Sequence, residues 1–198
     1  PGGTGVSVTA EGITLKDQSA TRGTGAVVLS ATANSGGLLT LDAAGDIVAN
    51  GSVDLTGTGG ISTAGDVTTN VASSPVNYHS GTTLTGAVAI DTTNAGGVAA
   101  GSLVRLFTTL DGNQTLGVTA GTGGDVTFSG LVGDTTPLGA ITINSANNVT
   151  ANGVRAASLV QTTGQATTLL NAGTFTDTTV EALNTTGAAL DPGIPQTS

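Results

Sequence analysis

Short runs of alternating apolar residues, separated by small or turn-forming residues, recur along most of this chain. Two apolar residues flank a single intervening residue, and the next such pair follows after a corner rich in Gly, Asn, Asp and Ser. Alternation with a period of two is strand spacing, whereas Gly, Asn and Asp tolerate the backbone conformations of tight corners. The pattern predicts many short strands joined by short turns. Examples are Val6/Val8, Ile13/Leu15, Leu39/Leu41, Val53/Leu55, Val88/Ile90, Val126/Phe128 and Ile141/Ile143.

Internal similarity indicates that the strands belong to a repeating unit. The fifteen residues that start at Gly37 match those that start at Gly139 at six positions. The thirteen residues that start at Thr24 match those that start at Thr85, also at six positions. A shorter echo relates the Ala-Gly-Asp triplet ending at Asp46 to the triplet ending at Asp66.

The three offsets are close to five, three and one times a unit of about 20 residues. A coil that stacks on its own copies explains such a unit better than antiparallel hairpins do. The sequence therefore predicts an all-β parallel β-helix, a β-solenoid with rungs of about 20 residues.

Composition and charge narrow the classes of function. Strong helix formers are scarce, and the abundant Thr and Val favour a pleated surface. Thirteen acidic and four basic residues give a net charge of −9, so we expect no nucleic-acid binding and no membrane insertion. The chain has no Cys, which fits an extracellular protein that is stabilised without disulfides.

The organisation expected along the chain is one solenoid domain over residues 1–186. Residues 71–80 interrupt the alternation with a Pro and with the only Tyr and the only His, and we interpret them as a loop excursion from a corner. Residues 187–198 contain two Pro and are predicted to be a C-terminal exit segment or linker. Neither end of the sequence offers an amphipathic cap, so we expect either a slice of a longer rod or, as the favoured alternative, ends that are covered by rungs of neighbouring copies.

Two stretches carry a family resemblance: GGLLTLDAAGDIVANGSVDL, from Gly36, and GDVTFSGLVGDTTPLGAITINSANNVTANGV, from Gly124. They resemble the repeats of filamentous-haemagglutinin-like and β-strand-repeat surface proteins of bacteria. The resemblance covers roughly residues 5–185 and implies a right-handed parallel β-helix in an exported adhesin, matrix or filament protein. It transfers no functional residue to this chain.

Few residues are candidates for chemistry. Tyr78 and His79 form the expected contact loop for a neighbouring molecule or a sugar, and His79 beside Ser80 is the one nucleophile–base pairing that the sequence suggests. The acidic residues are scattered, and Asp42, Asp46 and Asp54 are interpreted as corner or ladder residues. We therefore predict no catalytic, cofactor-binding or metal-binding site.

The first functional hypothesis is a non-enzymatic, extracellular or cell-surface bacterial structural protein. It would form a filament, sheath or adhesin stalk by head-to-tail stacking of its own copies through their terminal strands. A carbohydrate-binding or polysaccharide-cleaving β-helix that uses a lateral face, with surface glycans as partners, is the alternative. An antiparallel β-sandwich repeat from a large adhesin is a third, weaker interpretation.

Overall fold

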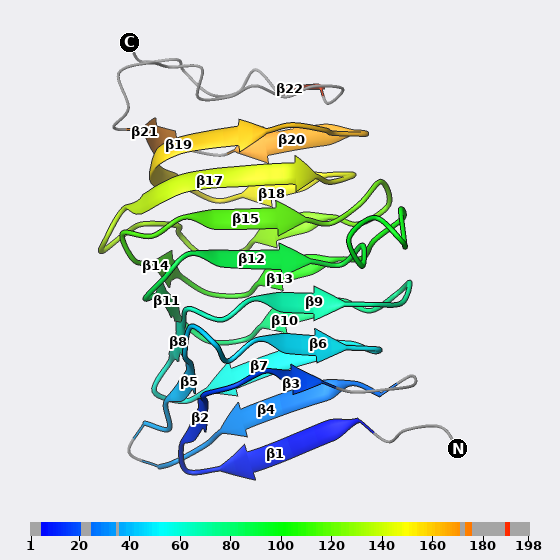
Figure 1. Cartoon of the computed structure of the whole chain (residues 1–198). Coiled ribbons are helices and arrows are strands. Elements are labelled where there is room, and N and C mark those ends of the chain that lie inside the picture. The colour runs from blue at the N-terminus through cyan, green and yellow to red at the C-terminus, as the bar shows by residue number, and fades with distance from the viewer. Residues whose placement is uncertain (1–4, 21–24, 35, 171–172, 176–188, 191–198) are drawn as a thin grey trace.

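The computed structural model describes residues 5–20, 25–34, 36–170, 173–175 and 189–190. Over these ranges the chain has no helix and folds as a parallel β-solenoid with about 23 residues per turn (Figure 1). The predicted parallel β-helix is confirmed.

Three parallel sheets form the walls of the coil. In the described residues, the first five turns contribute one strand to each sheet in the same order, and the later turns contribute strands to the nine-stranded and eight-stranded sheets only. The nine-stranded sheet contains β1 (Val6–Ala10), β4 (Val27–Ala31), β7 (Val53–Gly57), β10 (Val76–Tyr78), β13 (Val104–Leu106), β16 (Val126–Phe128), β18 (Val149–Ala151), β20 (Thr167–Leu170) and β22 (Ala189–Leu190). The five-stranded sheet contains β2 (Ile13–Leu15), β5 (Leu39–Leu41), β8 (Ile61–Thr63), β11 (Thr82–Leu84) and β14 (Leu110–Asp111). The eight-stranded sheet contains β3 (Ser19–Ala20), β6 (Ile47–Ala49), β9 (Val67–Thr69), β12 (Val88–Asp91), β15 (Leu116–Thr119), β17 (Leu138–Ser145), β19 (Val154–Gln161) and β21 (Gly173–Phe175).

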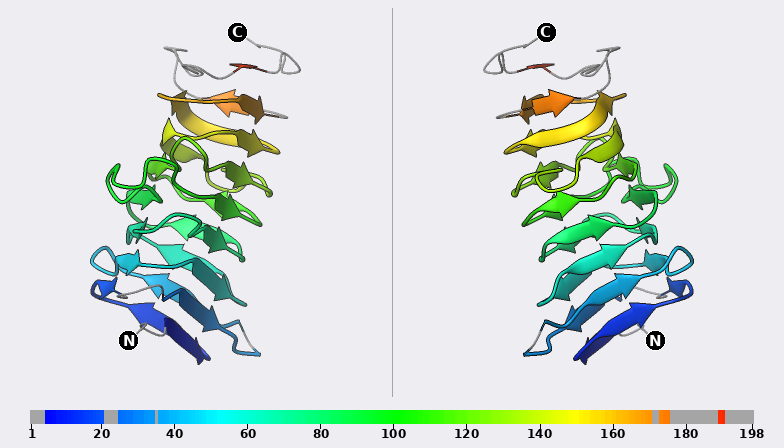
Figure 2. Two further views of the ribbon diagram at one scale, coloured as in Figure 1. Left: turned by 90° about the vertical axis from the view of Figure 1, so that its right-hand side faces the viewer. Right: turned by 90° about the vertical axis from the view of Figure 1, so that its left-hand side faces the viewer.

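The coil is right-handed, which is the hand expected for a connection between parallel strands. In Figure 1 the chain climbs from β1 towards β21, while β12, β15 and β17 run to the right in front and β13 and β18 run to the left behind. Figure 2 shows the same stack from two opposite sides, with successive rungs lying one above another along the axis of the coil. The right-handed coil implied by the family resemblance is therefore present.

Stacked columns of identical or similar side chains fill the interior. The first inward position of the nine-stranded sheet is Val in seven consecutive rungs, and its side chain is fully buried in most of them. Val suits this position because its branched side chain packs well on a pleated surface. Each fully buried side chain contributes about 1.5–3 kcal/mol. The buried members are Val27, Val53, Val76, Val104, Val126 and Val149.

The interior accommodates aromatic side chains. Tyr78 and Phe128 occupy the second inward position of the nine-stranded sheet and are 1% and 3% exposed. Tyr78 pairs with Leu55 and Leu106 in the neighbouring rungs, and Phe128 pairs with the small Ala151. The small Ala151 leaves space beside the Phe128 ring, whereas Tyr78 packs between two Leu side chains.

The predicted loop excursion over residues 71–80 is wrong in its second half. Val76–Tyr78 form β10, which pairs with β7 on one side and β13 on the other. Because Val76 faces inward, the period of two directs Tyr78 inward as well. The corner is therefore limited to the residues between Thr69 and Val76.

The repeat unit differs from the one that the alignments suggested. The longest offset relates β5 to β17, and the second relates β4 to β12, so each relates strands of different sheets. Only the repeated Ala-Gly-Asp triplets precede strands that pair with each other. They end at Asp46 and Asp66, and Ile47 of β6 pairs with Val67 of β9.

The spacing between stacked strands also varies from turn to turn. A long turn leads from Val76 to its partner Val104, and a short one leads from Val149 to its partner Thr168. Corners differ in length while the alternation inside strands stays the same.

The expected exit segment, residues 187–198, lies outside the described residues except for Ala189–Leu190. These two residues form β22, which pairs with β20 at the end of the nine-stranded sheet. In the described part of the chain, no helix is long and apolar enough to cross a membrane.

Candidate functional site

A cluster of polar, charged and aromatic side chains lies on the outer face of the nine-stranded sheet. Asp54, Asn77 and Arg105 occupy the first outward positions of β7, β10 and β13 and pair in register across the three rungs. His79 directly follows β10, and Phe107 directly follows β13. The backbone N–H of Phe107 donates a hydrogen bond to the carbonyl of Tyr78. The regular stacking therefore gathers residues that are far apart in the chain.

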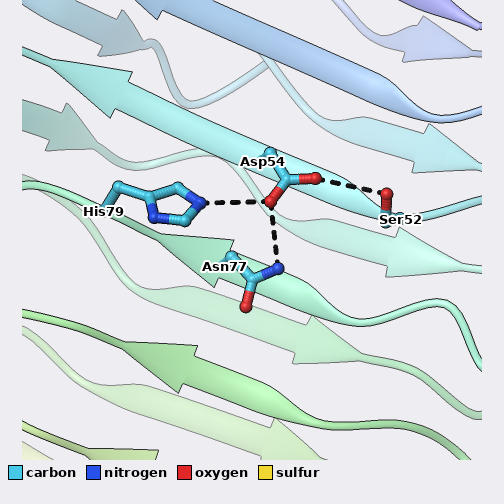
Figure 3. A network of polar contacts seen from close by, with 4 residues as sticks. All are labelled: Ser52, Asp54, Asn77 and His79. Carbon is cyan, nitrogen blue, oxygen red and sulfur yellow. Dashed lines mark hydrogen bonds and ion pairs between the residues drawn. The ribbon is translucent and has the colours of Figure 1, made fainter.

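Asp54 is the acceptor at the centre of the cluster (Figure 3). Its Oδ1 accepts a hydrogen bond from Asn77 Nδ2 at 3.0 Å and lies 3.1 Å from His79 Nε2. Its Oδ2 accepts a hydrogen bond from Ser52 Oγ at 3.2 Å. Because a carboxylate only accepts, His79 Nε2 carries the hydrogen of the His79–Asp54 bond.

Phe107 is half-buried and contacts side chains of its own and the preceding rung. The His79 ring, from the preceding rung, stacks on it with centroids 4.6 Å apart and an interplanar angle of 22°. The Arg105 guanidinium carbon lies 4.2 Å from the centroid of the Phe107 ring, and Arg105 Nε reaches Ser129 Oγ in the following rung at 3.4 Å. The Phe107 ring is thus engaged within the molecule and is a poor platform for stacking a sugar.

The chemistry of this cluster is cross-rung stabilisation. The side chains of His79 and Asp54 are 36% and 30% exposed, so their hydrogen bond contributes at most about 1 kcal/mol. The ring stack and the cation–π contact each add roughly 0.5–1 kcal/mol. The cluster stabilises the stacking of three consecutive rungs through side-chain contacts on their solvent-exposed face.

The structure separates the two residues of the expected contact loop. His79 is exposed, but Tyr78 is buried in the core, so the prediction that both form a contact surface is wrong for Tyr78. Burial raises the pKa of the Tyr78 phenol, and the negative charge of Asp66 adds to this effect. The Tyr78 hydroxyl has no hydrogen-bond partner among the described residues.

His79 and Ser80 are not arranged as base and nucleophile. Ser80 Oγ accepts a hydrogen bond from the backbone N–H of Gly57 at 3.1 Å, whereas His79 Nε2 is directed to Asp54. The neighbouring Ser52 donates to the same carboxylate and not to the imidazole.

Several acidic residues accept hydrogen bonds from the backbone of the next rung, and Asp46, one of the three residues interpreted as corner or ladder residues, is among them. Asp46 Oδ1 accepts a hydrogen bond from the N–H of Asp66 at 2.8 Å, and Asp66 Oδ1 accepts one from the N–H of Ala89 at 2.7 Å. Asp125 Oδ1 accepts hydrogen bonds from both the backbone and the side chain of Asn148. No group of three His, Asp or Glu side chains in the described ranges could hold a metal ion.

The partners of His79 were not predicted from the sequence, because Asp54, Arg105 and Phe107 are far apart in the chain. The usable signal was the shared pattern Val-x-Leu in β7 and β13 and Val-x-Tyr in β10, which places the residues after each pattern in one column.

Comparison with protein-family models, with curated proteins and with solved structures finds no match to this chain.

Proposed function

We propose that this protein is a non-enzymatic structural subunit, a β-solenoid that stacks end to end into a filament, sheath or adhesin stalk. The resemblance to bacterial surface-protein repeats and the absence of Cys support a place outside the bacterial cell or on its surface. The observation that carries the proposal is the exposure of apolar side chains in the first described rung of the coil.

The first described rung leaves apolar side chains uncovered. Val8 is 38% exposed, whereas Leu29, its partner in the next rung, is 2% exposed. Val6, Ile13 and Leu15 are only partly buried, although the residues stacked on them have no exposed surface. Another rung placed on this face would bury the exposed part of all four side chains.

The backbone of the first rung is also open. The strands β1, β2 and β3 are the terminal strands of the three sheets, so among the described residues each has a partner strand on one side only. The sequence of β1, VSVTA, has no charged residue and no Pro, which are the usual protection of an edge strand against association. The edge is thus a template for main-chain hydrogen bonds to a further parallel rung.

A second copy of this chain fits such an edge because its own rungs have the required cross-section and side-chain columns. Contact between one end and the opposite end of the next copy is heterologous and does not close, so it produces a linear polymer. The lateral faces, with polar cross-rung contacts such as the Asp54 cluster, keep the rod rigid and soluble.

Negative-stain electron microscopy of the purified full-length chain over a dilution series tests the proposal. We expect filaments of uniform width that persist on dilution. Val8→Lys should replace them with separate short rods, because an inward-facing charge at the edge blocks a further rung. Ser7→Lys is the matched control, since Ser7 is the exposed neighbour of Val8 on the same strand and points outward.

Circular dichroism and thermal melting show whether both variants remain folded. Separate rods from the unmodified chain would contradict end-to-end assembly. Filaments from Val8→Lys as long as those from Ser7→Lys would contradict the role of the first rung.

A further inference from the structure

The longest of the corners that the structure describes in full projects from the lateral surface of the coil. The turn from Val76 of β10 to Val104 of β13 is longer than the following turn, from Val104 to Val126 of β16. The added residues lie between the end of β12 at Asp91 and the start of β13, and Figures 1 and 2 show this segment outside the stack. Insertions on one face of a repeat protein are often the places where it binds its ligands.

The corner is tightly held despite its length. Thr92 and Ser102, both buried at its base, exchange hydrogen bonds of 2.8 and 3.0 Å. Asn94 and Ala95 adopt positive φ angles of 51° and 52°. Non-glycine residues in this region cost free energy and concentrate at functional sites.

A hollow of about 320 Å³ lies between this corner and the two following rungs. This volume is near the lower limit of ligand pockets, about 300–1,000 Å³. The hollow is open to solvent, and its walls carry one carboxylate, four hydroxyl groups and no large apolar side chain. The polar residues in the lining are Asp91, Thr93, Thr119, Thr122 and Ser145.

The hydrogen bonds already made inside the molecule determine what the hollow offers to a ligand. Thr119 Oγ1 accepts from Asn144 Nδ2 at 3.1 Å, and Ser145 Oγ accepts from the N–H of Gly121 at 3.0 Å. Each of these two hydroxyls therefore keeps its O–H for donation. Thr122 Oγ1 donates to the carbonyl of Ala99 at 3.2 Å and keeps its lone pairs.

The carboxylate adds a further acceptor. Asp91 Oδ1 accepts from the N–H and the hydroxyl of Thr93, and Oδ2 accepts one hydrogen bond, from the N–H of Ala95 at 2.8 Å. Oδ2 keeps one lone pair for a ligand. The hollow thus presents two donors and at least two acceptors close together.

The free hydrogen-bond donors and acceptors of the hollow indicate which class of ligand it can bind. An anion would meet the Asp91 carboxylate on a chain of net charge −9. A calcium ion needs six to eight oxygen ligands, more than one carboxylate supplies, and an apolar ligand would find only small side chains to cover it. Hydroxyl groups of a sugar both donate and accept. We infer that the hollow beneath the Asp91–Val104 corner binds a neutral hexose residue of a glycan.

Saturation-transfer difference NMR tests this inference, with the methyl glycosides of glucose, galactose, mannose and N-acetylglucosamine as probes. The method observes the sugar, so it works on single rods and on filaments alike and does not depend on the proposed assembly. We expect a saturable signal for at least one glycoside in the millimolar range. Thr119→Val keeps the shape of the side chain and removes one donor, so it should weaken that affinity about fivefold.

Thr142→Val is the matched control, because Thr142 lies on the outer face of the adjacent strand β17 and does not line the hollow. It should leave the affinity unchanged. Absence of a saturable signal for all four glycosides would overturn the inference. Equal affinity of the Thr119→Val and Thr142→Val variants would also overturn it, because the sugar would then bind elsewhere.

Discussion

Tyr78 is held inside the coil by the alternation of one short strand. Its hydroxyl is buried without a partner among the described residues, and an unsatisfied buried polar group costs about 1–3 kcal/mol. The ring nevertheless stays inside, because turning it outward would require Val76 to leave the core as well.

The ionisation of Tyr78 predicts a loss of stability in alkali. Burial raises the pKa of its phenol above the ordinary value of about 10. Below about pH 10 the phenol is protonated in both the folded and the unfolded state, so ionisation of Tyr78 does not lower the free energy of unfolding. Above it the unfolded chain loses the proton first, so the free energy of unfolding falls as the pH rises. Near-ultraviolet absorbance follows this directly, since the chain has one Tyr and no Trp.

Tyr78→Phe is the control for this prediction. It should remove the alkaline transition and stabilise the protein at neutral pH by about 1 kcal/mol, because it deletes the unpaired hydroxyl. A phenol that titrates near its ordinary pKa of about 10 in the folded protein would show that Tyr78 is accessible to water.

Gly101 is a position where a side chain is poorly tolerated. Its φ angle is +60°, and a Cβ placed there would overlap the carbonyl oxygen of Ala120 in the next rung. We expect Gly101→Ala to lower the free energy of unfolding by at least about 2 kcal/mol, measured by denaturant titration.

Gly117→Ala is the matched substitution in strand β15. The added Cβ would lie 4.0 Å from its nearest neighbour, the carbonyl oxygen of Val88. It should be neutral or stabilise by about 0.5 kcal/mol. Equal losses in the two variants would mean that the close approach at Gly101 does not exist in solution.

At the scale of elements, rungs are joined by carboxylates at the corners as well as by strand pairing. Asp46, Asp66 and Ala89 form a series in which each carboxylate accepts the backbone N–H of the next rung. This series leads into the eight-stranded sheet on the side where β6, β9 and β12 stack. It satisfies backbone groups where the ladder of the sheet has not yet begun.

Asp66→Ala should therefore destabilise the protein by about 1 kcal/mol, because the N–H of Ala89 loses its acceptor. Asp42→Ala removes the same charge at a neighbouring exposed corner where the carboxylate accepts no hydrogen bond among the described residues, and it should change stability by less than about 0.5 kcal/mol. Thermal melting of both variants measures the difference. A larger loss for Asp42→Ala would contradict the role given to Asp66.

At the scale of the whole molecule, stability and assembly have the same origin. Each rung contacts mainly the rungs before and after it, so the stability of the rod is a sum of interactions between neighbours. An end rung lacks one of these contacts, as the exposure of Val8 illustrates. Stacking a further copy supplies that contact.

Net charge opposes this stacking, which gives a prediction about salt. Two copies of net charge −9 repel each other, and the repulsion is screened as the Debye length falls from about 30 Å at 0.01 M salt to about 10 Å at 0.1 M. We expect filaments to lengthen with added salt, as measured by sedimentation and light scattering. Shortening would indicate that ion pairs, and not apolar burial and main-chain hydrogen bonds, hold the ends together.

The sequence by itself determined the class of fold, because alternation and corner residues are local properties that each rung repeats. It also determined the ladder role of acidic residues such as Asp46, since a carboxylate at a corner has a backbone N–H within reach. The candidate site depended on pairing that local patterns do not contain. His79, Asp54 and Phe107 come together through corners whose lengths differ from one turn to the next.

The same variation explains why the repeat alignments related strands of different sheets. All strands share one alternation, so sequence similarity does not distinguish the three walls of the coil. Register is decided by which inward side chains fit above one another, as Phe128 fits above Ala151, and this is a property of packing in three dimensions. The position of Tyr78 and the hollow beside Asp91 follow from that packing.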